Sequence, residues 1–179
     1  GGVVRRARGA EQQRGPDGFA RAGDLAATGS AHVPDLRGPA VAAVRDAGPG
    51  EYVHLWASLP CTGGSPWQYV NQKHPGAQER IRGHLQLFIK LIRNFKIVAR
   101  EVLARHGDIS FEWPTGCALW KTPEIQDMIE EFALNTVNFH GCAAGLASKD
   151  GVPIKKPWTG STSSPAELVQ FRVLWRGAP

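Results

Sequence analysis

The sequence predicts a mixed α/β fold of the Rossmann-like type, with a mostly parallel sheet and covering helices. Three short apolar segments, 52–58, 109–114 and 136–141, have the composition of buried strands. Two segments between them, 78–105 and 122–134, repeat apolar residues at the three- and four-residue spacing of amphipathic helices. Strands that alternate with helices are typical of parallel sheets, because a helix provides the crossover between neighbouring strands.

The first 30 residues differ in composition from the rest of the chain. Gly, Arg and Ala dominate them, and no helical or strand period is sustained. We therefore expect residues 1–30 to be disordered or poorly ordered, and residues 31–179 to form a single α/β domain. A chain of 179 residues with 42% hydrophobic and 21% charged residues is sufficient for one domain with a proper core.

Charge and hydropathy limit the classes of partner. The formal net charge is +5 and the pI is about 9.4, which is compatible with a polyanion such as a nucleic acid. No segment approaches the roughly 18 uninterrupted apolar residues that cross a bilayer, so no membrane partner is expected. The Arg-containing N-terminus lacks the apolar stretch of a secretory signal.

The predicted elements follow in order from about residue 33. Residues 33–36 are a short extended segment. Residues 38–47 form a modest helix, with Pro39 in its first turn and Gly48-Pro49-Gly50 after its end. The strand 52–58 comes next and leads into a loop that begins with a proline and a cysteine.

The two longer helices have clear ends. The first stops at His106-Gly107-Asp108, and the second begins with Thr122 as N-cap and Pro123 in its first turn. Residues 156–163 lead into a fourth strand. The apolar residues expected to face inward from the two helices are Ile81, Leu85, Phe88, Ile92, Phe95, Ala99, Val102, Ile125, Met128, Ile129 and Phe132.

Chemically active side chains follow the ends of the predicted strands. Cys61 follows the first strand, Glu112 ends the second, and His140 and Cys142 follow the third. Functional groups gather at the carboxyl ends of parallel strands. One edge of the sheet is therefore expected to carry a thiol, a carboxylate and an imidazole.

The Cys61 loop suits a nucleophile. Pro60 forces the strand into a defined turn, and Gly63 and Gly64 allow close approach to a ligand. Backbone N–H groups and nearby cations lower the pKa of a thiol in such a loop. The alternative is a small buried cysteine beside a structural turn, with no chemistry.

Glu112 lies among apolar residues, and burial there raises the pKa of a carboxyl group. A Glu kept protonated near neutral pH can donate a hydrogen bond to a ring nitrogen; the alternative is a carboxylate at the rim of the sheet or the partner of a lysine. Trp113 suits either stacking on a base or core packing. Lys155 and Lys156 suit a phosphate backbone, or simply a solvated turn.

The cysteines exclude some kinds of site. Cys61, Cys117 and Cys142 are odd in number and contain no CxxC pair. A disulfide framework and a metal site are therefore not expected, and a reducing, intracellular compartment is favoured.

Taken together, the segments "LPCTGGS", "FEWP" and "GCAAGL…GVPIKKPW" resemble the catalytic half of the DNA cytosine-5 methyltransferases over roughly residues 33–163. They are also similar to segments in polyproteins of eukaryotic retrotransposons. The resemblance implies an incomplete methyltransferase-type core, a DNA partner, S-adenosylmethionine as the cofactor of an active form, and a nuclear location.

The resemblance also implies roles for individual residues. Cys61 would add to C6 of a flipped-out cytosine, and Glu112 would hold the N3 edge of the ring. Asp35 and Pro60 would lie at the cofactor. The substrate-binding positions would be Ser65, Lys155 and Lys156.

The chain also departs from the family pattern. No Phe-x-Gly-x-Gly loop precedes the Pro-Cys strand, and Glu112-Trp113-Pro114 stands where the family has Glu-Asn-Val. A partial or degenerate methyltransferase-like domain is therefore expected. One alternative is a non-catalytic α/β module of a mobile-element polyprotein that binds nucleic acid or protein. Another is a small acyl-transferring hydrolase that pairs Cys61 with His140.

Overall fold

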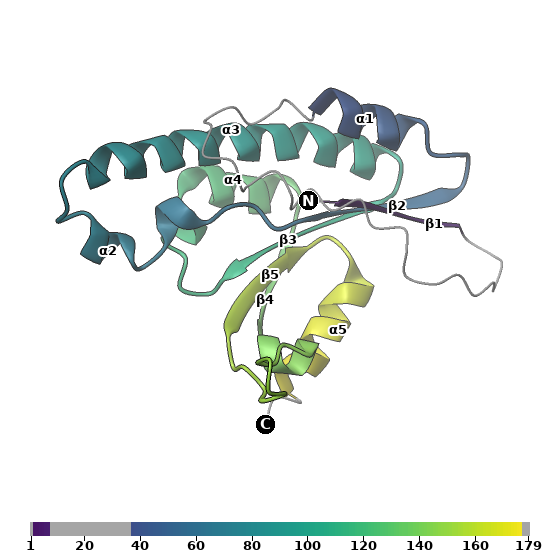
Figure 1. The fold of residues 1–179 in the computed structure, drawn as a ribbon. Coiled ribbons are helices and arrows are strands. Elements are labelled where there is room, and N and C mark those ends of the chain that lie inside the picture. The colour runs from purple at the N-terminus through teal and green to yellow at the C-terminus, as the bar shows by residue number, and fades with distance from the viewer. Residues whose placement is uncertain (1, 8–36, 177–179) are drawn as a thin grey trace. The chain divides into compact units, whose positions relative to one another are not determined.

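A computed structural model describes residues 2–7 and 37–176 (Figure 1). The chain divides into two compact units. The first unit comprises Gly1–Ala57 and Arg93–Ile109, and the second unit comprises Ser58–Ile92 and Ser110–Pro179. The expectation of one domain over 31–179 stays a prediction.

The first unit contains a two-stranded antiparallel ribbon. β1 (Gly2–Ala7) pairs with β2 (Glu51–Ala57), from Gly2 opposite Trp56 to Ala7 opposite Glu51. Residues 2–7 are thus a strand, although they belong to the segment 1–30 that we expected to be disordered. Residues 8–30 lie outside the described residues.

The helices of the first unit are α1 (Arg37–Arg45) and residues 93–104 of α3 (Ala77–Ala104). β2 alternates between buried and half-buried residues, as a strand with one covered face does. The buried apolar residues of this unit are Val44, Ala47, Val53, Leu55, Ala57, Phe95, Val98, Ala99, Val102 and Ile109.

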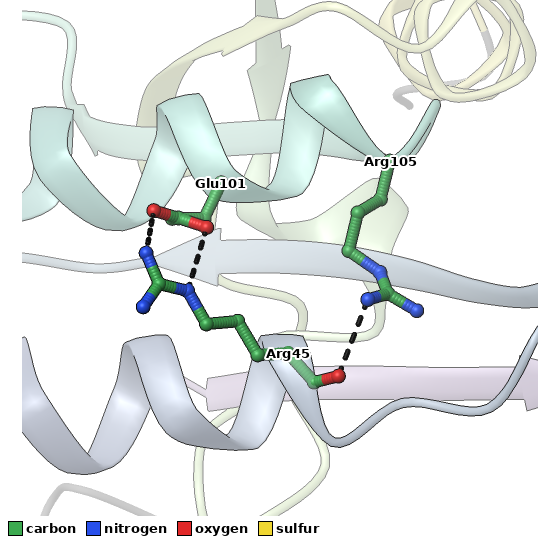
Figure 2. A network of polar contacts seen from close by, with 3 residues as sticks. All are labelled: Arg45, Glu101 and Arg105. Atoms are coloured by element: carbon green, nitrogen blue, oxygen red, sulfur yellow. Dashed lines mark hydrogen bonds and ion pairs between the residues drawn. The ribbon is translucent and has the colours of Figure 1, made fainter.

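Polar contacts fasten the end of α1 to α3 (Figure 2). Arg45 donates from Nε and Nη2 to the two carboxylate oxygens of Glu101, at 3.1 and 2.6 Å. Arg105 donates to the carbonyl oxygens of Arg45, at 3.2 Å, and Ala47, at 2.5 Å. A cation at this position satisfies carbonyls that the last turn of a helix leaves without intrahelical donors.

The second unit contains a sheet in which β5 (Pro157–Thr162) lies between β3 (Asp108–Pro114) and β4 (Asn135–His140) (Figure 1). β5 is antiparallel to both of its neighbours. β3 and β4 therefore run parallel to each other, and their carboxyl ends lie at the same edge, where β5 begins.

Short helices and turns connect these strands. The α-helices of the second unit, besides residues 77–92 of α3, are α2 (Gln68–Asn71), α4 (Pro123–Glu131) and α5 (Pro165–Arg176). Three 3₁₀ turns, η2 (Thr62–Gly64), η3 (Ala118–Lys121) and η4 (Gly141–Ala144), follow the ends of β2, β3 and β4.

The mixed α/β class is confirmed, but a mostly parallel Rossmann-like sheet is not. The pairs β1–β2, β3–β5 and β4–β5 are all antiparallel. The connection from β4 to β5 holds only η4 and a loop bridged between Ala147 and Pro153. Because no helix crosses over at this point, β5 returns in the opposite direction.

The predicted helices and strands are confirmed to within about three residues at their ends, and Thr122 is the N-cap residue of α4, as predicted. Pro123 is the first residue of α4, as expected. The hydroxyl of Thr122 donates to the Leu119 carbonyl, at 2.8 Å, and makes no cap bond to the helix.

The core of the second unit is an aromatic cluster around Trp113. This side chain is 1% exposed, and its ring lies 5.0 Å from Phe111, 5.5 Å from Trp120 and 5.9 Å from Phe88, measured between centroids. Of its two possible roles, core packing is therefore confirmed. The cluster fixes the end of β3, where Glu112 lies.

Candidate functional site

Cys61 lies in the loop after β2, in the second unit. Its carbonyl accepts a hydrogen bond from Gly64 N, at 3.0 Å, which closes the turn η2. Trp113 Nε1 donates to the Leu59 carbonyl, at 2.6 Å, and so attaches the loop to β3. The Cys61 side chain is half-buried, and Pro60 is exposed.

A second cysteine lies against this loop. Cys117 is buried in the turn after β3, where its N–H donates to the Pro114 carbonyl, at 2.9 Å. Its Sγ lies 4.0 Å from the Cys61 carbonyl oxygen, and its thiol is close enough to the Cys61 side chain to lower the pKa of that group. This pairing was not predicted, although both cysteines follow the ends of predicted strands.

Gly64 makes this close approach possible. A Cβ at this position would lie 2.9 Å from Cys117 Sγ, and 2.5 Å and 2.8 Å from Cγ and N of Leu119. Such separations are too short for real Cβ contacts. Gly64 was expected to allow close approach to a ligand. In the structure it allows close approach to the turn that contains Cys117 and Leu119.

The surroundings of Cys61 favour its thiolate. The hydrogen bond from Cys117 is the largest cause that lowers the Cys61 pKa, and burial opposes it. With further help from the backbone and from the positive charge of Lys156, the pKa of Cys61 falls from 9.0 to about 6. The same hydrogen bond and burial raise the pKa of Cys117. At neutral pH, Cys61 is therefore the thiolate and Cys117 the thiol donor.

Glu112 is half-buried between two fully buried aromatic residues of β3. Burial raises its pKa, as expected from its apolar neighbours, while a hydrogen bond with Ser58 and the charge of Lys156 act in the opposite direction. Ser58 lies three residues before Cys61 in the chain. The carboxyl group therefore lies beside the loop that carries the thiolate.

The positive charge of Lys156 acts on both Cys61 and Glu112. Its backbone carbonyl accepts from Gly141 N, at 2.8 Å, which fixes it at the end of β4. Its Nζ lies 4.4 Å from the centre of the Trp158 ring. From this position its charge lowers the pKa of both Cys61 and Glu112. Lys155, the preceding residue, is exposed.

A cavity of about 300 Å³ adjoins the Cys61 loop. Its walls contain several hydrogen-bond donors and no carboxylate; the lining residues are Thr62, Gln68, Asn71, His74, Ala77, Arg80 and His84. Two aromatic residues near it, Trp67 and Tyr69, are 73% and 68% exposed. This cavity was not predicted, because its residues come from a loop, a short helix and the start of α3.

The remaining predicted positions have varied environments. Ser65 is half-buried, and its Oγ accepts from Trp67 N, at 3.4 Å, at the start of α2. His140 ends β4, and Cys142 is half-buried in η4. Asp35, the proposed cofactor contact, lies outside the described residues.

Within residues 2–7 and 37–176, no group of three or more His, Cys, Asp or Glu side chains is placed to hold a metal ion. No helix in the same part of the chain is long and apolar enough to span a membrane.

Comparisons with known proteins return no match: no family model, no curated protein and no solved structure is significantly similar to this chain.

Proposed function

We propose that the second unit is a partial or degenerate DNA cytosine-5 methyltransferase-like domain, in which Cys61 attacks C6 of a cytosine. The observation that carries the proposal is that Cys61, Glu112 and Lys156 lie in one unit, where the charge of Lys156 lowers the pKa of the other two residues. A thiol whose pKa is about 6 and a carboxyl group whose pKa is raised by burial are the nucleophile and the acid that this attack requires.

The proposed attack requires an ionised thiol and a protonated carboxyl group. The Cys61 thiolate forms a bond to C6, and the electron pair of the C5–C6 double bond moves through C5 and C4 onto N3. A protonated Glu112 donates to N3 and stabilises the charge that develops on the ring. Because C6 is inaccessible within a duplex, the base must be flipped out or already single-stranded.

The cavity beside the loop supports a nucleic-acid substrate. His74, Arg80 and His84 offer donors to a phosphate, and no lining residue would repel one. Trp67 and Tyr69 expose flat rings on which unpaired bases stack. Lys155 and Lys156 provide further positive charge after the turn at 150–153.

The residues of this chain do not fit the methionine part of S-adenosylmethionine. The sequence contains no Phe-x-Gly-x-Gly loop. We therefore derive no methyl-transfer step, and the proposal rests on the attack on the base. S-adenosylmethionine, the methyl donor of this family, would bind only if another segment supplied the missing Phe-x-Gly-x-Gly loop.

Release of the C5 hydrogen tests the attack without any cofactor. Addition of Cys61 to C6 makes C5 basic, so C5 takes a proton from water; loss of the original hydrogen and elimination of the thiolate then regenerate cytosine. A single-stranded oligonucleotide with tritium at cytosine C5 should release tritium into water with wild-type protein and with the control variant Cys142→Ser. Cys61→Ser should release none.

The second candidate is a non-catalytic nucleic-acid-binding module. The lack of a Phe-x-Gly-x-Gly loop for S-adenosylmethionine in this sequence favours it. It predicts that the folded protein binds the same oligonucleotide, that Arg80→Ala weakens this binding, and that no tritium is released. Binding with no release by wild-type protein would overturn the catalytic proposal in favour of this one. Absence of both binding and release would overturn the two together.

A further inference from the structure

Cys61 and Cys117 form a close pair of thiols from two different turns. Cys117 Sγ lies 4.0 Å from the Cys61 carbonyl oxygen, so the Cys117 thiol lies against the residue that carries the other thiol. Gly64 lets the two turns approach, because a Cβ there would lie 2.9 Å from Cys117 Sγ. The two sulfurs must approach to about 2.05 Å to form a covalent bond.

We propose that Cys61 and Cys117 are a reversible redox pair, which a peroxide converts into a disulfide. The inference goes beyond the proposed function and does not depend on it. It rests on the contact between the two thiols and on their unequal exposure. Cys61 is half-buried and accessible to a small oxidant, whereas Cys117 is 4% exposed and is placed to react with Cys61.

The reaction with hydrogen peroxide has two balanced steps. The Cys61 thiolate attacks one peroxide oxygen, the O–O bond breaks, and the products are a sulfenic acid on Cys61 and hydroxide. Cys117 sulfur then attacks the Cys61 sulfur, the S–O bond breaks, and the Cys117 proton leaves with the hydroxyl group as water. Two thiols are oxidised by two electrons in total, and the peroxide is reduced to water.

The disulfide removes the thiolate from the loop. Alkylating reagents that modify Cys61 in the reduced protein should therefore fail after oxidation, and a dithiol reductant should restore the reaction. The sequence had led us to expect no disulfide framework, and a bond that forms only on oxidation is consistent with free thiols in the reduced state.

Tryptic digestion separates the three cysteines onto three peptides, 46–73 with Cys61, 106–121 with Cys117 and 122–149 with Cys142. After brief peroxide treatment and blocking of free thiols, we expect mass spectrometry to find 46–73 joined to 106–121, with the loss of two hydrogens. Dithiothreitol should separate them. Peptide 122–149 should carry the blocking group in the same sample.

Two variants make the test specific. In Cys117→Ser, the sulfenic acid on Cys61 should persist and react with dimedone, whereas Cys142→Ser should form the cross-link as wild type does. Circular dichroism verifies that each variant is folded. The proposal is overturned if wild-type Cys61 accumulates as a dimedone-reactive or over-oxidised thiol while 106–121 keeps a free thiol. Preferential joining of 46–73 to 122–149 would overturn it equally.

Discussion

Replacement of Cys117 by alanine should raise the pKa of Cys61. The hydrogen bond from Cys117 is the largest cause that lowers this pKa to about 6, and alanine removes the donor. Lys156 and the backbone still act on the thiol in the variant. The pKa of Cys61 is therefore expected to lie between about 6 and its ordinary value of 9.0.

The size of the effect depends on pH in a characteristic way. At pH 7 about nine-tenths of a thiol with a pKa of about 6 is ionised, against about one-hundredth of a thiol with a pKa of 9.0. A thiolate of higher pKa is more nucleophilic, by about 20-fold over this interval. If the pKa rises all the way to 9.0, the rate of alkylation at pH 7 therefore falls by about fivefold, whereas a rise to about 7 leaves this rate nearly unchanged. Above pH 9 the rate should exceed that of wild type in either case.

The assay is the rate of reaction of Cys61 with iodoacetamide between pH 5 and 10, followed by mass spectrometry of peptide 46–73. Wild type should reach half of its maximal rate near pH 6, and Cys117→Ala at a higher pH. Cys117→Ser keeps a hydroxyl donor and should lie closer to wild type. Identical profiles for wild type and Cys117→Ala would refute the reasoning, because the thiol contact would then have no effect on ionisation.

Three further perturbations test the packing and the charges. Gly64→Ala should lower the free energy of unfolding by about 1–3 kcal/mol, measured by urea denaturation, because its Cβ meets Leu119 at 2.5 Å; Gly116→Ala, whose Cβ meets only one atom, at 3.7 Å, should be nearly neutral. Glu112→Gln should become increasingly more stable than wild type as pH rises above 4.5. The reason is that the raised pKa makes ionisation of Glu112 less favourable in the folded state than in the unfolded state. A difference in the free energy of unfolding between the two proteins that stays constant across pH 4–8 would contradict this. Arg105→Ala should destabilise the protein by about 1 kcal/mol, because two carbonyl oxygens lose a charged donor. Arg105→Lys should lose less, and equal midpoints for all three proteins would show that the contact is not stabilising.

The sequence predicted the elements well because each has a local cause. The apolar spacing of 78–105 gave α3, Pro123 gave the start of α4, and Pro114 gave the end of β3. The grouping of Cys61 with Glu112 followed from the ends of successive strands. These features depend on neighbours in the chain, so the amino-acid pattern carries them.

The direction of β5 and the partner of Cys61 depend on distant contacts. β5 was not predicted to be antiparallel. The sequence does contain one indication of this direction: the segment between β4 and β5 has no helical period, and a parallel strand would need a crossover helix there. Cys117 lies beside Cys61 because Gly64 leaves space between two turns that are far apart in sequence. A pattern that shows which residues are buried does not show which buried residues touch.

The position of β5 has a consequence for synthesis of the protein on the ribosome. β3 and β4 are made first, and each has an edge whose backbone groups remain unpaired until residues 157–162 emerge. Unpaired edges promote association between nascent chains. Lys156 directly precedes the strand that pairs these edges, so the charge that stabilises the Cys61 thiolate arrives together with the last strand of this sheet. A ribosome-bound chain that ends before Lys156 should therefore be aggregation-prone and should have a higher pKa at its Cys61 thiol.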